Sequence, residues 1–266
     1  MSSPYIGVTG IVKRSETEYC LNALPANCTR RLMVGLLASS TTVSGRDNTL
    51  WNKFPKLRDA RNIFIKDRRA FNCFHFASRK LELPNLYNHL MMLLDAANGV
   101  LDGIQINNAW PDVKVLSKVQ DQSPGLKFIL QVSPHLDEFK GMTAEEIAKR
   151  YLASYGELAD YFLIDYSRGL GVEMDIDQTL ELMLQFDRFD SSHKKPGRLV
   201  GCGGLCADNV GRLILPLQRR IQCLSWDAEG KLRDESEGGG HLVMYKTVEY
   251  IKKSAELSKP IELFSS

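Results

Sequence analysis

The sequence has almost no excess charge of either sign and no long apolar run. Its 266 residues include 34 basic and 32 acidic side chains, which gives a net charge of +2. Such a balance argues against nucleic acid or an anionic membrane surface as a partner. No apolar run reaches the ~18 residues that a membrane-spanning helix needs, and MSSPYIGVTGIV at the start does not resemble a signal peptide. We therefore expect a cytoplasmic protein with no membrane contact.

Cysteine motifs and metal-ligand spacings are also missing. The six cysteines show no CxxC spacing, and several lie in apolar, strand-like segments. This pattern favours buried free thiols over disulfides or a zinc site. No set of histidines and carboxylates has metal-ligand spacing, so we expect no metal. Beyond its one glycine-rich turn, the sequence has no further dinucleotide-binding fingerprint, which argues against a hydride-transfer enzyme. We therefore expect no cofactor.

Short apolar runs alternate with helical patterns along the whole chain. The runs are too apolar for a half-exposed sheet, which indicates parallel strands buried on both faces. Eight strand-then-helix units suit a (β/α)8 barrel, whereas a doubly wound sheet rarely has eight without a second domain. No Pro/Ser-rich linker is present, so the sequence predicts an α/β fold, a single (β/α)8 TIM barrel over residues 1–266. The expected strands are 5–9, 32–38, 71–76, 101–106, 127–132, 161–164, 199–200 and 221–225.

Two helix starts can be placed from their capping residues. Thr143 and Glu146 have the spacing of a capping box, and the helix that they open is expected to run to about Tyr155. Asp175 or Asp177 is expected to cap the helix that follows the sixth strand. These two aspartates are better explained as helix caps than as metal ligands.

The segment 198–212, RLVGCGGLCADNVGR, combines a short buried strand, a glycine turn and the start of a helix. Backbone N–H groups in such a turn point toward an anion, and glycine lets the ligand approach because it has no Cβ. The arrangement is common in α/β proteins, so by itself it favours a structural role. In the predicted barrel it follows the seventh strand, where barrels commonly bind phosphate together with strand eight. We therefore expect Gly203 and Gly204, assisted by Ser225, to bind phosphate.

Polar residues follow nearly every predicted strand, and barrel active sites lie at this end of the strands. Asp165 directly follows the sixth strand, where a partly desolvated carboxylate suits acid–base catalysis. The structural alternative is pairing with Arg168 or with a neighbouring loop amide. His135 is a candidate second proton carrier or an ordinary surface histidine. His75, between two phenylalanines, is better explained as a hydrogen-bonded core residue. Gln105 is expected to point into the barrel, toward a ligand or into a polar core layer.

Four short motifs follow the order of the predicted strands. They are VTGIV at 8–12, LDGIQIN at 101–107, DYFLIDYS at 160–167 and GCGGLCADNV at 201–210. Together they resemble the first, fourth, sixth and seventh strands of the phosphoribosylanthranilate isomerase branch of the ribulose-phosphate-binding barrels. The seventh-strand motif is the most specific of the four. The resemblance implies a (β/α)8 barrel that acts on a phosphorylated sugar, with Asp165 as the acid.

The chain departs from that family at positions that matter for its chemistry. Thr9 stands where the family has the first-strand cysteine that serves as base, and a threonine hydroxyl does not ionise near neutral pH without a strong activator. Asn107 stands at the position of the fourth-strand histidine. Trp226 and Asp227 replace a serine and a glycine on strand eight, which affects half of the phosphate site. The tryptophan-pathway reaction of the family is therefore not expected here.

Three hypotheses stay open at this point. The leading one is an enzyme with isomerase- or lyase-like acid–base chemistry on a ribose-phosphate-type small molecule. The alternatives are a phospho-ligand-binding barrel without catalysis, and a hydrolase or glycosyl-transfer enzyme on the same fold. The oligomeric state is left open, with a homodimer among the alternatives. The expected site residues are catalytic Asp165, Thr9 and His135, substrate-binding Gln105, Asn107 and Arg168, and phosphate-binding Gly203, Gly204 and Ser225.

Overall fold

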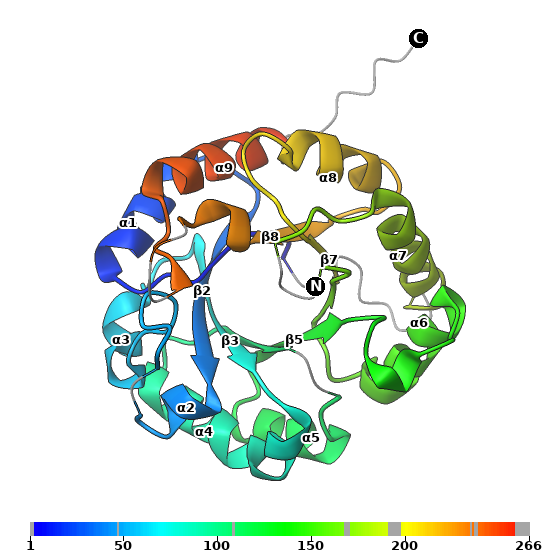
Figure 1. Ribbon diagram of the computed structural model, residues 1–266, viewed down its shortest axis with the longest axis horizontal. Coiled ribbons are helices and arrows are strands. Elements are labelled where there is room, and N and C mark those ends of the chain that lie inside the picture. Colours follow the sequence, from blue (N-terminus) through cyan, green and yellow to red (C-terminus); the bar gives the residue numbers. More distant parts are fainter. Residues whose placement is uncertain are drawn as a thin grey trace.

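Eight parallel strands close into a barrel in the computed structural model (Figure 1). Each strand pairs with the next one along the chain, and β8 pairs with β1 to close the ring. The structure describes residues 3–46, 48–107, 110–167, 171–190, 198–234, 236 and 239–258. The predicted (β/α)8 fold is confirmed. The strands are β1 (Tyr5–Thr9), β2 (Arg31–Ser39), β3 (Ala70–Ala77), β4 (Gly103–Asn107), β5 (Lys127–Val132), β6 (Tyr161–Ile164), β7 (Leu199–Cys202) and β8 (Ser225–Ala228).

Helices connect the strands and surround the barrel on its outside (Figure 1). The capping box predicted at the start of α6 is confirmed, since Thr143 Oγ1 accepts the N–H of Glu146 at 3.3 Å. Asp175 Oδ1 accepts the N–H of Gln178 at 3.0 Å and caps α7. The helices are α1 (Arg14–Ala23), α2 (Ser40–Val43), α3 (Ala60–Ile63), α4 (Leu86–Ala97), α5 (Val113–Gln122), α6 (Ala144–Tyr155), α7 (Ile176–Asp190), α8 (Val210–Gln218) and α9 (Met244–Glu256), with 3-10 turns η1 (Leu57–Asp59), η2 (Lys80–Asn85), η3 (Asp137–Phe139) and η5 (Gly230–Leu232).

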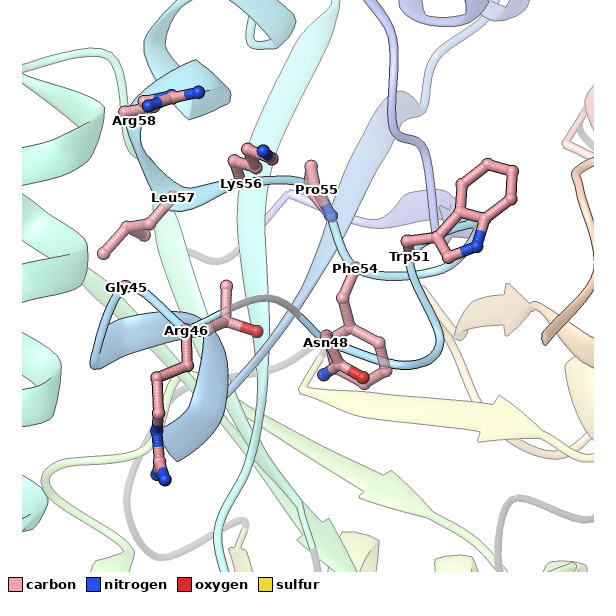
Figure 2. Close-up of a pocket in the computed structure, with 10 residues that line it drawn as sticks. Gly45, Arg46, Asn48, Trp51, Phe54, Pro55, Lys56, Leu57 and Arg58 are labelled. Carbon is pink, nitrogen blue, oxygen red and sulfur yellow. The ribbon is translucent and has the colours of Figure 1, made fainter. Parts of the chain in front are cut away.

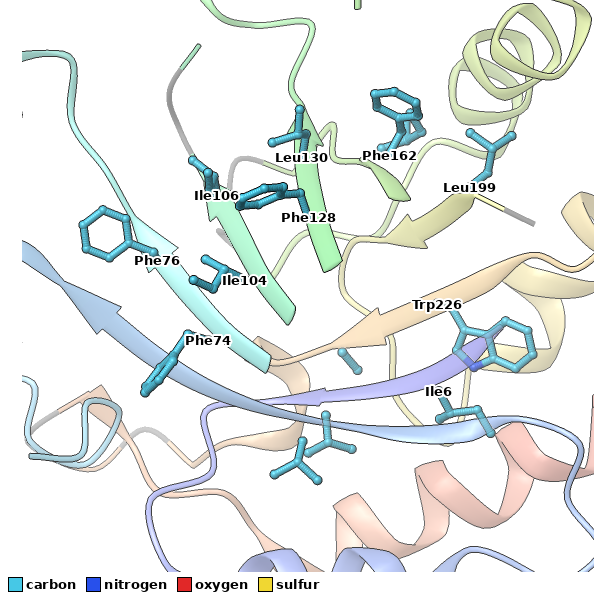
Figure 3. Close-up of a cluster of buried hydrophobic side chains, with 14 of the residues drawn as sticks. Ile6, Phe74, Phe76, Ile104, Ile106, Phe128, Leu130, Phe162, Leu199 and Trp226 are labelled. Carbon is cyan, nitrogen blue, oxygen red and sulfur yellow. The ribbon is translucent and has the colours of Figure 1, made fainter. Parts of the chain in front are cut away.

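Apolar side chains on the outer face of the strands form the larger of two hydrophobic clusters, against the surrounding helices. Ile104 and Ile106 on β4 and Phe128 on β5 belong to it, and all three are buried (Figure 3). Burying apolar surface on the helix-facing side of every strand accounts for the near-continuous apolar runs in the sequence. The residues between them, such as Gln105, face the interior of the barrel.

The interior of the barrel is filled by aromatic side chains at the amino ends of the strands. The ring centroids of Tyr5, Phe71 and Tyr161 lie 5.2 to 5.9 Å apart, and all three rings are buried. This cluster fills the barrel interior at that end. Four residues further along the same strands, the inward-facing side chains are polar: Thr9, His75 and Asp165.

The predicted bounds of the eighth strand, 221–225, are wrong. The strand runs from Ser225 to Ala228, and Cys223 just before it has a left-handed φ of 55°, which no extended strand contains. Ile221 and Leu224 are buried in the core cluster without being part of a strand. Their apolar character therefore reflects burial under the barrel and not strand formation. The strand therefore starts four residues and ends three residues later than predicted, so different residues lie at its carboxyl end.

Candidate active site

A cavity of about 310 Å³ opens at the carboxyl ends of the strands. Residues from β2 to β8 and the loops that follow them line it. Of the expected site residues, Asp165, Gln105, Asn107, Gly203 and Gly204 all lie in its wall. They come from three separate parts of the sequence, and closure of the barrel brings them together.

Asp165 is held rigidly at the end of β6. Its Oδ1 accepts hydrogen bonds from the N–H and the hydroxyl of Ser167, both at 2.7 Å, and its Oδ2 accepts one from Gln131 Nε2 at 2.5 Å. The side chain is 3% exposed and lines the cavity. Three donors on two oxygens fix the orientation of the carboxylate. Asp165 therefore serves the cavity as a positioned hydrogen-bond acceptor.

Asp227 on β8 is a second carboxylate in the same cavity. It is 7% exposed, and both of its oxygens lie 3.0 Å from the hydroxyl of Thr9, which donates to it. Burial raises the pKa of Asp227 to about 8, and the charges of Glu229 and Asp165 contribute in the same direction. At neutral pH this carboxyl group is therefore mostly protonated, unlike an ordinary aspartate. The sequence analysis considered Asp227 only as a departure from the family's phosphate site and did not name it among the site residues.

Thr9 contacts both Asp227 and His75 and links the two side chains. Nε2 of His75 lies 3.2 Å from Thr9 Oγ1 and 3.3 Å from Met33 Sδ, and burial lowers the pKa of His75 to about 3. The imidazole is therefore neutral, as expected for a hydrogen-bonded core histidine, although its ring also reaches the cavity. Gly35 on β2 makes room for this contact, since a Cβ there would lie 2.8 Å from Thr9 Oγ1. Thr9 is 1% exposed and acts on Asp227.

The glycine turn after β7 forms another part of the wall. Gly203 and Gly204 have φ of 125° and 57°, and a Cβ on Gly204 would lie 2.8 Å from the backbone N of Glu173. The turn thus needs glycine both for its backbone conformation and for its packing against the segment before α7. The N–H groups of Gly204 and Leu205 have no acceptor within the described part of the chain. Of these two residues, Gly204 lines the cavity.

Cys202 is a further cavity residue that the sequence analysis did not single out. It lies opposite Asp227 in the register of β7 and β8, and its thiol donates to the carbonyl of Ile164 at 3.2 Å. Burial and the neighbouring charges of Asp165 and Asp227 raise the pKa of this thiol well above its ordinary value. The sulfur is therefore a neutral thiol and not a thiolate nucleophile.

Thr9, which contacts Asp227, and two other expected site residues, His135 and Ser225, are not among the residues that line the cavity. His135 is exposed on the loop after β5, where its Nε2 lies 3.1 Å from the carbonyl of Tyr166. Ser225 is the first residue of β8, fully buried at the amino end, and accepts the N–H of Tyr5 at 3.0 Å. The expectation that Ser225 assists at the phosphate turn is thus corrected, because the strand begins where it was expected to end. Arg168 lies outside the described residues.

A larger cavity, of about 700 Å³, lies beside the mouth between α2 and the loop before α3. Phe54 lines both cavities. Figure 2 shows Arg46 and Arg58 at opposite edges of this hollow, while the ring of Trp51 extends away from both. Arg46, Lys56 and Arg58 make the wall of this larger cavity basic. The cavity at the carboxyl ends of the strands is instead lined by several carboxyl groups.

Metal and membrane features are absent from the described part of the chain. No three histidine, cysteine, aspartate or glutamate side chains there are grouped in a way that could hold a metal ion. Across the same residues, every helix is too short or too polar to cross a bilayer.

Comparison with known proteins places the chain by its fold. No family model matches the sequence, and no curated protein matches it. The structure is similar to phosphoribosylanthranilate isomerase from Thermotoga maritima, with a TM-score of 0.62 and 17% identity over 95% of this chain and 99% of that one. A GH18 chitinase from Pseudoalteromonas aurantia gives 0.57 and 11% over 95% and 99%, and orotidine 5'-monophosphate decarboxylase from Methanocaldococcus jannaschii gives 0.51 and 10% over 96% and 98%. The chain shares the (β/α)8 barrel with all three. At these identities the likeness shows the fold alone.

Proposed function

We propose that the protein is an acid–base enzyme that acts on a phosphorylated sugar of the ribose-phosphate type, with isomerase- or lyase-like chemistry. The observation that carries this proposal is a pair of carboxyl groups in one cavity with different environments. Asp165 accepts three hydrogen bonds, whereas burial raises the pKa of Asp227 to about 8. One group is thus placed to accept a proton while the other holds one to donate.

For an aldose–ketose isomerisation, the two groups divide the work as follows. Asp227 donates its proton to the carbonyl oxygen at C1 while Asp165 accepts the proton from C2, which produces an enediol. Asp165 then returns its proton to C1, and Asp227 recovers one from the hydroxyl at C2. The substrate and product have the same atoms, and both carboxyl groups end in their starting states. The exchange of protons needs no cofactor.

The phosphate in this proposal is bound at the glycine turn. The N–H group of Gly204, which lines the cavity, has no acceptor among the described residues, and an anion at such a turn requires no side-chain charge. Lys53 lines the same cavity and adds an ammonium group. Its distance of 3.7 Å from Glu229 Oε1 leaves it able to contact a ligand as well.

A second candidate, a glycoside hydrolase, is favoured by the same pair of carboxyl groups. Glycosidases use one protonated and one ionised carboxyl group on either side of the scissile bond. Asp227 matches the protonated group, and Asp165 is the second carboxyl group in the same cavity. In this alternative Asp227 protonates the leaving oxygen. The sugar then has no need for a phosphate, which separates the two candidates experimentally.

The test combines turnover with binding on Asp165→Asn, Asp227→Asn and the control Asp121→Asn, an exposed position on α5. Turnover of ribose 5-phosphate should fall by ~10²-fold or more in the two cavity variants, while calorimetric affinity changes little and the control behaves as wild type. Full turnover in Asp165→Asn would eliminate it as the proton acceptor. Tight binding without turnover by the wild type would indicate a binding protein. Cleavage of unphosphorylated glycosides, with no binding of ribose 5-phosphate, would support the second candidate.

A further inference from the structure

Gln105 on β4 carries a buried polar atom with no partner. The side chain is 3% exposed, and its Nε2 donates to Asn107 Oδ1 at 2.8 Å. Its Oε1 is buried and accepts no hydrogen bond from the described part of the chain. Leaving a buried carbonyl oxygen without a donor costs about 1–3 kcal/mol. Such an atom in an active-site cavity indicates where a ligand donor belongs.

The position of this atom separates it from the other unpaired buried atoms of the protein. Among the described residues, Gln105 is the only one that both carries such an atom and lines the mouth cavity. Gln218 provides a contrast, because its Oε1 is also unpaired but its Nε2 donates to the carbonyl of Leu257, near the end of α9. The unpaired oxygen of Gln105 therefore belongs to a residue that a bound ligand can reach, whereas Gln218 does not line the cavity.

Two other groups in the cavity wall are hydrogen-bond acceptors. Asp165 and Glu229 place carboxyl groups there, whereas the carboxyl group of Asp227 holds a proton at neutral pH. Lys53, the ammonium group among the described lining residues, already lies 3.7 Å from Glu229 Oε1. A carboxylate in the part of the ligand beyond its phosphate would be repelled by these carboxyl groups. Hydroxyl or amino groups in that part of the ligand could instead donate hydrogen bonds to the acceptors in the cavity wall.

We infer that Gln105 selects the substrate by accepting a hydrogen bond from one of its hydroxyl or amino groups. The substrate body is therefore a polyhydroxylated or aminated chain or ring, and not an aromatic carboxylate. This inference rests on the proposed function, since it concerns the same cavity and adds the part of the substrate beyond the phosphate. Discrimination against an analogue that lacks the matching hydroxyl follows, because that analogue leaves Gln105 Oε1 unpaired.

The experiment measures calorimetric affinity for ribose 5-phosphate and for its 1-, 2- and 3-deoxy analogues. The wild type should bind one analogue ~10-fold or more weakly than ribose 5-phosphate. Gln105→Met, which has a similar shape and no acceptor, should lose this discrimination and bind ribose 5-phosphate about as weakly as wild type binds that analogue. Gln105→Glu keeps an acceptor and cannot donate, so it should keep the discrimination.

A control and a stability measurement complete the test. Gln218→Met should leave all four affinities unchanged. Ligand-free Gln105→Met should melt at or above the wild-type temperature, since it removes an unpaired buried oxygen. Equal affinities of the wild type for all four ligands, or discrimination retained by Gln105→Met or lost in Gln105→Glu, would overturn the inference and leave the proposed function intact. Failure of the wild type to bind any of the four would overturn the proposed substrate class itself.

Discussion

Replacing Asp227 with asparagine should stabilise the protein, and the gain should grow with pH. Burial raises the pKa of Asp227 from 3.8 to about 8, so the folded chain keeps this proton where the unfolded chain has released it. A raised carboxyl pKa favours folding at low pH, and that contribution is lost as the pH rises from 3.8 through about 8. Asparagine has a similar shape and no proton to release, so it removes this dependence.

The size of the effect follows from the two pKa values. One pH unit corresponds to about 1.4 kcal/mol, so the difference between 3.8 and about 8 corresponds to about 6 kcal/mol of unfolding free energy. At 7% exposure the carboxyl group is shielded from solvent, and screening reduces the figure little. Weakening the hydrogen bond from Thr9 offsets about 1 kcal/mol. The remaining gain above pH 8 is comparable to the whole stability of many domains, about 5–15 kcal/mol.

Urea unfolding of the wild type and of Asp227→Asn from pH 4 to pH 9, followed by circular dichroism, measures the difference in unfolding free energy directly. The difference in unfolding free energy should rise by about 1.4 kcal/mol per pH unit and become constant above about pH 8. Thr9→Val provides a second arm, because the hydrogen bond from Thr9 lowers the pKa of Asp227. Without that bond the rising part should extend to higher pH. A difference that is constant across the range, or that shrinks as the pH rises, would refute the reasoning.

Two further changes test the packing and the thiol of the cavity wall. Gly204→Ala should cost about 1–3 kcal/mol, because φ is 57° and the new Cβ would lie 2.8 Å from the N of Glu173; Gly125→Ala, with nothing within 4 Å, should be near neutral in the same melting experiment. Cys202 should resist iodoacetamide at pH 8, because burial and adjacent carboxylates raise its pKa, while exposed Cys223 should react. Peptide mass spectrometry measures the labelling of both cysteines, and faster labelling of Cys202 would contradict its description as a neutral thiol.

Local sequence signals placed several parts of the site correctly. Asp165 directly follows an apolar strand, and Gln105 alternates with two isoleucines, so each could be put at the carboxyl end or on the inner face of its strand. Gly203 and Gly204 could be put at the carboxyl end of the seventh strand because the glycine turn lies between a strand and a helix, and both line the cavity. These inferences depended only on neighbouring residues.

The bounds of the eighth strand were wrong because residues that are buried need not belong to a strand. Ile221 and Leu224 have the apolar character of a strand, yet they pack in the core within a turn. Placing the strand there put Ser225 at the mouth, where Asp227 belongs. Periodicity cannot distinguish a buried turn from a buried strand when the run is only four or five residues long.

The sequence alone determined the barrel, because alternating apolar runs and helical patterns are local and their number is a property of the chain. The tertiary structure alone decided which polar side chains meet inside it. Thr9, His75 and Asp227 lie on β1, β3 and β8, and only closure of the ring places the last strand beside the first. The raised pKa of Asp227 has the same origin, since it depends on the solvent that the closed barrel excludes. Burial of a charged group is a property of what surrounds it, and those surroundings come from distant parts of the chain.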